Sequence, residues 1–451
     1  MLSLIFYIFY ISLFFVTFYF CIKCPIKLIY PLIFSSQFNV TSFFKFGMTF
    51  SFFEINLFIS IFTILFFYSK EIVIKYKIKF TESDKIFSLF LLISIISIFI
   101  GIIRVLLNNL SPDKYIVTPF YLRSFMSLNK IFIYLPFLIF LRTKLLNLYS
   151  NNILQNTFLK ALAISGILPA LAAILQFSNI GFYLIHNNPS FSESFRIEDY
   201  HGVRIVGLTN EASFFVYQLF FPTLAIYYCW IKKLLNKKYL KIILSIYILT
   251  VVISISRTGL LIYFIFLLLI LFREYRMNFN LIIKSLFIII PLTILLSNIN
   301  IIGFNLLERL ISTFQYSSDS STLERYGSMQ ALLNLLLSKS IIIGVGIYNY
   351  QYYIKQYLPD YMNVFNYGNG DTPTSFNFLL QILVEFGLLF SLIFFLISIK
   401  LLKKNKNINF QKDWFIFLLI FSLSFQTLNF SIPFLILLYP NGNINENTLR
   451  T

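Results

Sequence analysis

The sequence predicts an all-α polytopic membrane protein, and three features lead to this prediction. The 451 residues are 58% hydrophobic and only 12% charged, with a mean hydropathy of +0.80. Apolar runs of about twenty residues, the length that crosses a bilayer as a helix, recur along the whole chain. Lys and Arg are concentrated in alternate loops. Backbone polar groups need internal partners in hydrocarbon, so we expect the spans to be helical.

About eleven runs qualify as spans, or twelve if the last run is divided. They are residues 1–22, 52–68, 86–107, 121–141, 158–177, 212–230, 242–256, 260–272, 281–296, 376–399 and 414–439. The first run lacks a basic start and a small-residue cleavage site, so we expect a retained membrane helix. The last run contains Asn429 and Pro433, which predicts two segments or a helix with a re-entrant piece. We expect one transmembrane domain over residues 1–451.

The distribution of basic residues predicts the orientation of the chain. With a cytoplasmic N-terminus, the inside loops hold 21 of the 36 Lys and Arg residues. These loops are residues 69–85, 142–160, 231–241, 273–284 and 400–413. The net charge of +18 therefore indicates topology and contact with an anionic lipid bilayer, rather than binding to nucleic acid. The same topology places loops 179–208 and 300–375 outside.

The longer outer loop, 300–375, is expected to carry a helix of its own. The stretch SSDSSTLERYGSMQALLNLLLSKS opens with a Ser-x-x-Glu capping box at Ser321. Apolar residues follow at helical spacing: Met329, Leu332, Leu333 and Leu336. We expect an amphipathic helix lying against the membrane surface. Loops of this length are usually functional rather than connective.

Arg204 and Glu211 lie in the stretch RIVGLTNEAS, where loop 179–208 enters the sixth span. In one interpretation Asn210 caps the helix, and Glu211 stabilises the positive end of its dipole. In the other, the two ionisable residues form a functional site, because such a pair is costly at the mouth of a helix bundle. Glu211 is then a candidate general base.

Two further arginines are candidate ligands for a phosphate group. Arg257 lies in SISRTGLL between two spans, where it could also snorkel to the interface. Arg325 lies on the expected loop helix, where Glu324 could pair with it locally. A planar guanidinium suits phosphate because its donors can engage two oxygens at once. Together with Arg204, these arginines predict a diphosphate site at the outer face.

Histidine and tyrosine provide the remaining candidates. His186 and His201 are the two histidines, both in loop 179–208 and without acidic neighbours at metal-ligand spacing, so no metal site is expected. His201 is a second candidate general base, or a solvated loop residue. Tyr348, Tyr350 and Asn377 are candidate sugar-binding residues, although interfacial tyrosines are also common in membrane proteins.

Four stretches, in this order and topology, resemble the O-antigen polymerase and O-antigen ligase superfamily of Wzy-type membrane glycosyltransferases. They are RIVGLTNEAS, SISRTGLL, ERYGSMQALLNLLLSKSIIIGVGIYNY and SFNFLLQILVEFGL. The resemblance covers roughly residues 204–388. It implies a C-type glycosyltransferase-like helical fold that needs no metal or nucleotide cofactor. It also implies transfer of a glycan from undecaprenyl diphosphate at the outer, periplasmic face of the bacterial inner membrane.

The resemblance also implies roles for individual residues. Arg204 and Arg257 match arginines that hold the diphosphate, Arg325 matches a loop arginine, and Glu211 matches the acidic residue of the Gly-Leu-Thr-x-Glu-x-Ser motif. Ligases of this superfamily usually carry a His-Asn pair just before the LQILVEFG stretch. Here residues 376–377 are Phe-Asn, which favours a polymerase.

The expected function is therefore a polymerase that joins lipid-linked repeat units into a surface polysaccharide, such as a capsule or the O-antigen of lipopolysaccharide. The arginines would stabilise the departing diphosphate, and a carboxylate would deprotonate the acceptor hydroxyl. One alternative is a ligase that passes finished glycan to a lipid or protein acceptor. Another is a transporter of lipid-linked sugars. A chain-length regulator and a flippase are the expected protein partners of a polymerase.

Overall fold

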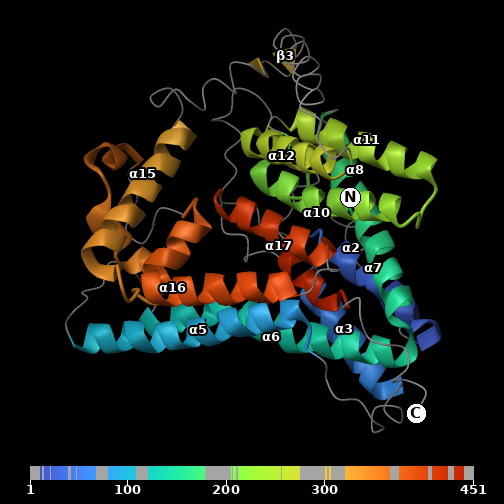
Figure 1. The fold of residues 1–451 in the computed structure, drawn as a ribbon, viewed down its shortest axis with the longest axis horizontal. Helices are drawn as coiled ribbons and strands as arrows, with labels where there is room; N and C mark the ends of the chain where they lie inside the picture. Colours follow the sequence, from blue (N-terminus) through green and yellow to red (C-terminus); the bar gives the residue numbers. More distant parts are fainter. Residues whose placement is uncertain are drawn as a thin grey trace. The chain divides into compact units, whose positions relative to one another are not determined.

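The computed structural model describes most of the apolar runs as helices (Figure 1). The described residues are 11–12, 15–20, 22–38, 42–46, 48–67, 80–107, 120–177, 205, 207–209, 212–254, 256–274, 300–301, 304–305, 320–365, 375–404, 409–424 and 431–440. The chain forms two compact units, the first from Met1–Val73 and Ile153–Tyr316, the second from Ile74–Asn152 and Ser317–Thr451. Each unit is described by itself.

The first unit begins with short elements. These are the 3-10 helix η1 (Pro25–Leu28), α2 (Ile29–Ser35), the hairpin β1 (Ser42–Phe46) and β2 (Met48–Ser51), and α3 (Phe52–Phe67). The strands pair antiparallel, with Ser42 opposite Ser51. Helix α3 starts where it does because Ser51 and Glu54 cap each other's backbone: the Ser51 N–H donates to Glu54 Oε2 at 2.7 Å. Helices α2 and α3 pack against each other.

The rest of the first unit is a helical bundle around one buried helix. Its elements are α7 (Asn151–Ser165), α8 (Ile167–Phe177), α10 (Ala212–Ile231), α11 (Lys237–Ile253), α12 (Arg257–Glu274) and the two-residue strands β3 (Asn300–Ile301) and β4 (Phe304–Asn305). Helix α10 packs against α8, α11 and α12. In its most apolar stretch of 18 residues, 78% is buried inside the protein. Because α10 is apolar all round, it can be surrounded by its neighbours.

The second unit is built on three long helices. Its α-helices are α5 (Glu82–Leu106), α6 (Phe120–Leu148), α15 (Ser320–Leu335), α16 (Phe378–Lys404) and α17 (Asn409–Ser422). Its shorter elements are the π-helical turn η3 (Leu336–Ser340) and the 3-10 helices η4 (Tyr350–Tyr352), η5 (Ile354–Tyr357), η6 (Asp360–Phe365) and η8 (Ile432–Leu438). Helix α5 lies beside α6 and α16, and η8, buried throughout, packs on α6 (Figure 1).

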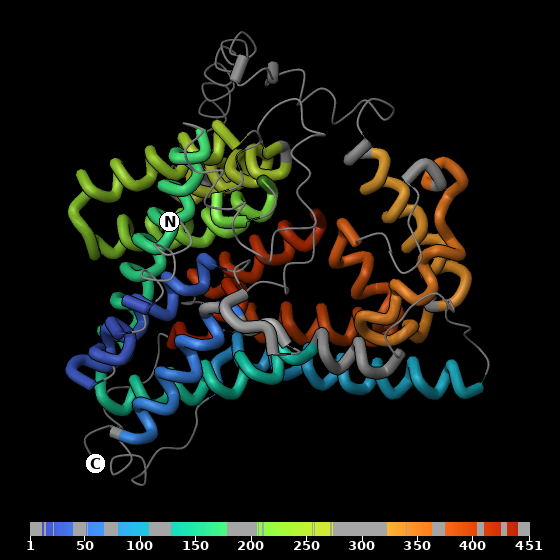
Figure 2. The backbone as a smooth tube through the Cα atoms, turned by 180° about the vertical axis from the view of Figure 1, so that it is seen from behind, coloured from blue at the N-terminus to red at the C-terminus, as the bar shows by residue number. Residues whose placement is uncertain are grey.

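Helix α16 is broken at Gly387, which has φ 76° and ψ 168°. This conformation is open essentially to glycine alone. The residues around the break bond to the segment that follows η3. Val345 and Gly346 donate their N–H groups to Val384 O and Glu385 O at 3.1 and 3.0 Å. The next segment of α16 donates back, from the N–H groups of Leu388 and Leu389 to Ile341 O and Ile342 O. Figure 2 shows the course of the backbone from behind.

The structure confirms the prediction of an all-α polytopic membrane protein. Within the described residues, five helices are long and apolar enough to cross a membrane: Glu82–Leu106, Leu128–Leu148, Asn151–Phe177, Ala212–Ile231 and Phe378–Lys403. Shorter apolar helices occur at Pro25–Ser35, Phe53–Phe66 and Thr258–Ile270. The expected run 281–296 lies outside the described residues.

Two expectations about individual segments can be compared with the structure. The run 414–439 contains two separate elements, α17 and η8, as one of the two expected arrangements required. The loop helix exists as α15 and begins at Ser320, one residue before the serine expected to cap it. Its apolar residues divide: Leu332 and Leu336 are buried inside the protein, whereas Leu333 is exposed. The sequence did not predict α2, which at seven residues is too short to register as a span.

Candidate functional site

The expected site residues are divided between the two units. Three of them lie outside the described residues: His201, Arg204 and Glu211. Arg257 is the first residue of α12 in the first unit, and its side chain is not among those described. The others belong to the second unit: Arg325, Tyr348, Tyr350 and Asn377. The two groups are therefore described separately.

In the first unit, a buried glutamine holds the turn between Arg204 and Glu211. Gln176, at the end of α8, donates from Nε2 to Gly207 O at 2.7 Å, and its Oε1 accepts from the Gly207 N–H at 2.9 Å. Gln176 is 1% exposed, so both bonds lie away from water. A side-chain amide that bonds both polar groups of one residue fixes that residue in place. Sequence reasoning missed Gln176, which stands as one polar residue near the end of an apolar run.

Gly207 itself requires glycine. Its φ is +58°, in the left-handed region, and an added Cβ would overlap the ring of Phe215 in the second turn of α10. Ile205 and Thr209 on either side are buried. The Gly-Leu-Thr turn is thus packed onto the beginning of α10 and bonded to the end of α8.

The start of α12 lies against the same part of α10. A Cβ on Gly259 would come within 2.6 Å of the Val216 side chain, so the two backbones approach closely there. Ser256, 2% exposed, caps α12 by accepting from the Gly259 N–H at 3.3 Å. Arg257 therefore begins a helix that is anchored beside the Gly207 turn through neighbouring residues of α10, Phe215 and Val216. The structure thus places Gly207 and Gly259, one from each motif, against adjacent residues of α10.

In the second unit, Arg325 of α15 lies over the ring of Phe376, with its Cζ 5.1 Å from the ring centroid. This is a cation–π contact. Phe376 stands where ligases of the resembled superfamily usually carry histidine. The adjacent Asn377 caps the start of α16: its Oδ1 accepts from the Leu380 N–H at 2.9 Å. Asn377 thus serves the helix start in this structure.

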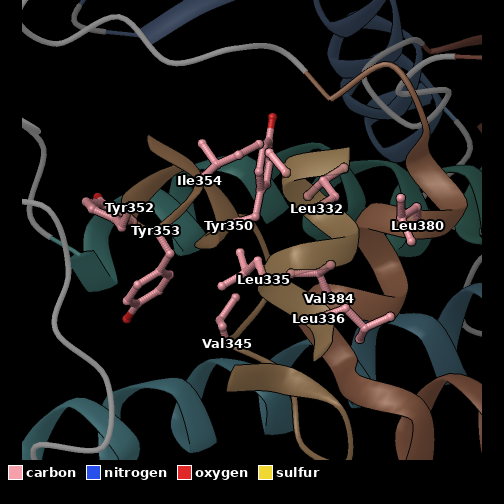
Figure 3. Close-up of a cluster of buried hydrophobic side chains, with 11 residues drawn as sticks. Leu332, Leu335, Leu336, Val345, Tyr350, Tyr352, Tyr353, Ile354, Leu380 and Val384 are labelled. Atoms are coloured by element: carbon pink, nitrogen blue, oxygen red, sulfur yellow. The ribbon is translucent and has the colours of Figure 1, made fainter. Parts of the chain in front are cut away.

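Tyr350 belongs to a buried cluster shared by α15, η4, η5 and α16 (Figure 3). The cluster consists of Ala331, Leu332, Leu335, Leu336, Val345, Tyr350, Tyr352, Tyr353, Ile354, Leu380 and Val384. The Tyr350 ring is fully buried, and its hydroxyl accepts from the Ser375 N–H at 3.0 Å. The faces of this ring are covered by protein, so its contacts here are structural. Through Ser375, Tyr350 helps to position Phe376 under Arg325.

Tyr348 lies two residues before Tyr350 and has a backbone conformation that is unusual for a non-glycine residue, with φ +58°. Burial raises the pKa of its hydroxyl above the ordinary value, and nearby Glu385 and Tyr350 raise that pKa further. Tyr348 therefore remains a neutral hydrogen-bond donor. Glu385, 1% exposed, accepts from Gln381 Nε2 at 3.0 Å within α16.

The glycines in GVGIYNY have a structural purpose. A Cβ on Gly344 would overlap the carbonyl of Glu385, and Gly346 has φ +96°. The motif lets the chain run against the broken part of α16.

As for metals, the described residues hold no cluster of three His, Cys, Asp or Glu side chains that could bind an ion.

These observations define a polytopic helical membrane protein with polar residues held at helix ends in each unit. Residues 242–396 match the family model described as O-Antigen ligase. The match covers about a third of the chain, 155 of its 451 residues, and supports a role in O-antigen or surface-polysaccharide assembly. The matched region includes Arg257, Arg325 and Phe376, and begins after Arg204 and Glu211. No curated protein and no solved structure matches the chain.

Proposed function

We propose that the protein is a polysaccharide polymerase that joins repeat units carried on undecaprenyl diphosphate, at the outer face of the bacterial inner membrane. The growing chain leaves its diphosphate carrier and is joined to a sugar hydroxyl of the next lipid-linked unit. The glycosyl–diphosphate bond supplies the reactivity. The enzyme needs cations for the departing diphosphate and a base for the acceptor hydroxyl.

One observation carries the proposal. The Gly207 turn and the start of α12 are anchored to adjacent residues of one buried helix, Phe215 and Val216. Arg204 is three residues before this turn, Glu211 is four residues after it, and Arg257 begins α12. The described backbone next to these three residues in the sequence, the Gly207 turn and the start of α12, is thus anchored to one helix. Preorganised charges of this kind are the main source of electrostatic catalysis.

Arg325 is the third proposed diphosphate ligand, and its contact with Phe376 orients the guanidinium in the second unit. Aromatic contact leaves the edge donors of a guanidinium available for phosphate oxygens. Tyr348 is the tyrosine better suited to sugar, because part of its surface is exposed although its hydroxyl is buried, whereas Tyr350 is buried throughout. We assign His201 as the alternative base to Glu211.

A second candidate is a ligase that transfers finished glycan to a lipid or protein acceptor, because the matching family model is described as O-Antigen ligase. Phe376, at the position where ligases usually have histidine, favours the polymerase. The two functions leave different products. Loss of a polymerase leaves single repeat units on the surface, whereas loss of a ligase leaves long polymer on the carrier lipid.

The experiment compares a deletion strain with strains that carry variants. We expect the deletion to leave single repeats. Arg257→Ala should reduce polymer on the order of 30- to 1,000-fold, with a smaller loss in Arg257→Lys, since lysine keeps the charge but not the planar fork. Arg273→Ala, in the last turn of the same helix, is the matched control. Normal polymer from Arg257→Ala at wild-type protein abundance would exclude Arg257 from the site.

Glu211→Gln and His201→Ala distinguish the two candidate bases. Glutamine keeps the size of the side chain but cannot take up a proton, so Glu211→Gln should abolish polymer while the protein stays in the membrane. His201→Ala should remain active. The reverse pattern would assign the base to His201, and two active variants would exclude both residues.

A further inference from the structure

The segment of residues 336–346, which follows α15 in the large loop, contacts two candidate membrane spans of the second unit, α5 and α16. We propose that this segment re-enters the bilayer and that lipid acyl chains cover its exposed apolar side. The proposal concerns the interaction of the loop with lipid and does not depend on the proposed function. Its first support is the depth at which the segment meets α5.

Helix α5 is a candidate membrane span, and its residues Ser97, Gly101 and Arg104 contact the segment or the part of α16 that bonds to it. A Cβ on Gly101 would come within 2.7 Å of Val345 O, and Ser97 Oγ donates to Glu385 O at 2.9 Å. Gly101 is five residues before the end of α5 at Leu106, which is about 8 Å of helix rise. The segment therefore lies below the end of the span.

Helix α16 gives a second, independent measure of the depth. The segment bonds to the broken part of α16 around Gly387, nine residues after the helix begins at Phe378. Nine residues correspond to roughly 13 Å of rise. With 25 and 27 residues, α5 and α16 extend roughly 4 to 5 Å beyond each side of a hydrocarbon core about 30 Å thick. Measured from the edge of the core, the two spans place these contacts roughly 4 to 8 Å deep.

Non-helical backbone is tolerated at such depth only if its polar groups are satisfied by protein. The segment meets this condition at four successive carbonyl groups. Ile341 O and Ile342 O accept from the N–H groups of Leu388 and Leu389 at 3.0 and 3.3 Å. Arg104 Nη1 donates to Ile343 O and Gly344 O at 2.7 and 2.9 Å, and its Nη2 donates to Lys339 O.

The outward side chains of the segment are apolar and widely exposed. Leu337 is 67% exposed and Ile342 is 63% exposed, and Ile341 and Ile343 are also exposed. This surface is continuous with exposed residues of α16, because Leu388 and Leu389, which bond to residues 341–342, are exposed as well. On a span, such residues face lipid.

Lipid is therefore the occupant that fits. The neighbouring surface of α16 belongs to a candidate span, and the segment has no unpaired carbonyl between residues 341 and 344 for water to solvate. Lys339 is the exposed charge in the segment, and its long side chain can reach the interface while its stem stays among apolar groups.

Fluorescence quenching in bilayers tests the depth. Single cysteines at Ile342 and Leu337, in a background without the native cysteines, are labelled with a small fluorophore in proteoliposomes whose phospholipids carry bromine on the acyl chains. We expect a loss of fluorescence comparable to that of a label at Leu392, an exposed residue of α16. A label at Asp360, an exposed residue of η6, should be quenched by iodide in water instead.

Quenching at Ile342 by iodide but not by brominated lipid would overturn the proposal. Disulfide cross-linking between Ile342→Cys chains, with no quenching by brominated lipid, would identify a second copy as the occupant and would also overturn it. Ile342→Asp gives a second test, because a charge at this depth should reduce membrane-inserted protein. Gln356→Asp on the exposed face of η5 should not, and equal abundance of the two variants would contradict re-entry.

Discussion

Arg142 binds Asp84 through both ends of its guanidinium group, inside the second unit. Nη1 donates to Oδ1 at 2.8 Å and Nη2 to Oδ2 at 2.6 Å, and the two side chains are 1% and 0% exposed. Asp84 also accepts from the Thr81 N–H and so closes the capping box that starts α5. Arg142 Nη1 further donates to Leu437 O at 2.8 Å. One ion pair thus joins α5, α6 and η8.

Breaking this pair should destabilise the protein strongly. Asp84→Asn keeps an oxygen for the Thr81 N–H but leaves the Arg142 charge buried without its counter-ion, and Arg142→Met strands the carboxylate. Each change should cost about 3 to 5 kcal/mol of folding stability. Thermal unfolding in detergent and the yield of membrane-inserted protein measure this cost.

The pair between Lys85 and Glu82, in the same first turn of α5, provides the control, because its lysine is exposed to water although Glu82 is buried. Lys85 is 43% exposed, so Lys85→Met should cost no more than about 1 kcal/mol. Replacing both members of the buried pair, as Asp84→Leu with Arg142→Met, should restore part of the lost stability. If the double variant were less stable than either single variant, the loss of one buried charge from the pair would not explain the destabilisation.

Gln176 should control activity more than folding. Gln176→Met keeps the length of the side chain but loses both bonds to Gly207. We expect polymer to fall roughly 5- to 150-fold, as the loss of about 1 to 3 kcal/mol of positioning predicts. Polymer yield per protein molecule is the measurement. Gln155→Met, a buried glutamine of α7 that accepts from Lys232, should keep wild-type activity per molecule.

Gly387→Ala should prevent normal folding of the second unit. An added Cβ at this φ and ψ is strained and would overlap the carbonyl of Ile342. The cost should be at least about 3 kcal/mol, visible as lost protein abundance. Leu392→Ala, at an exposed position of the same helix, should leave abundance near wild type. Normal abundance of Gly387→Ala would mean that α16 can run through this position unbroken.

The contact between Arg325 and Phe376 should orient the arginine. Phe376→Leu removes the ring, and the loss of roughly 0.5 to 2 kcal/mol should weaken polymer formation without abolishing it. Arg325→Ala should lower activity further, since it removes the proposed phosphate ligand itself. Phe376→Tyr keeps a ring beneath the guanidinium and should retain activity. If Phe376→Leu and Phe376→Tyr have equal activity, the ring does not orient Arg325.

Local pattern was enough to predict the five described helices that are long enough to cross a membrane, because each is a contiguous apolar run whose length alone indicates membrane crossing. Helix α5 and the buried α10 were both expected within a few residues of their observed ends. The break in α16 could not be predicted in this way. Its apolar pattern continues through Gly387, and the peptide groups that satisfy the break come from residues 341–346.

The same limit applies to the candidate site. RIVGLTNEAS identified the Gly-Leu-Thr turn because glycine and a charged pair are local signals. Gln176 is 31 residues from Gly207 and gave no such signal. Phe376 is 51 positions beyond Arg325, so their contact depends on how α15 packs against the start of α16. Contacts between residues so far apart in the sequence depend on tertiary packing, and no local sequence pattern indicates them.

The bond from Arg142 to Leu437 also has a consequence for biosynthesis. The two residues are 295 positions apart, and at about 5 to 20 residues per second a ribosome needs roughly 15 to 60 s to make the intervening chain. During that interval α5 and α6 can already pair through Asp84, while the site that η8 will occupy remains open to lipid, to water or to an assembly factor. The second unit therefore closes last at its C-terminal end, and a delay in synthesis between α6 and η8 should prolong its exposure to membrane proteases.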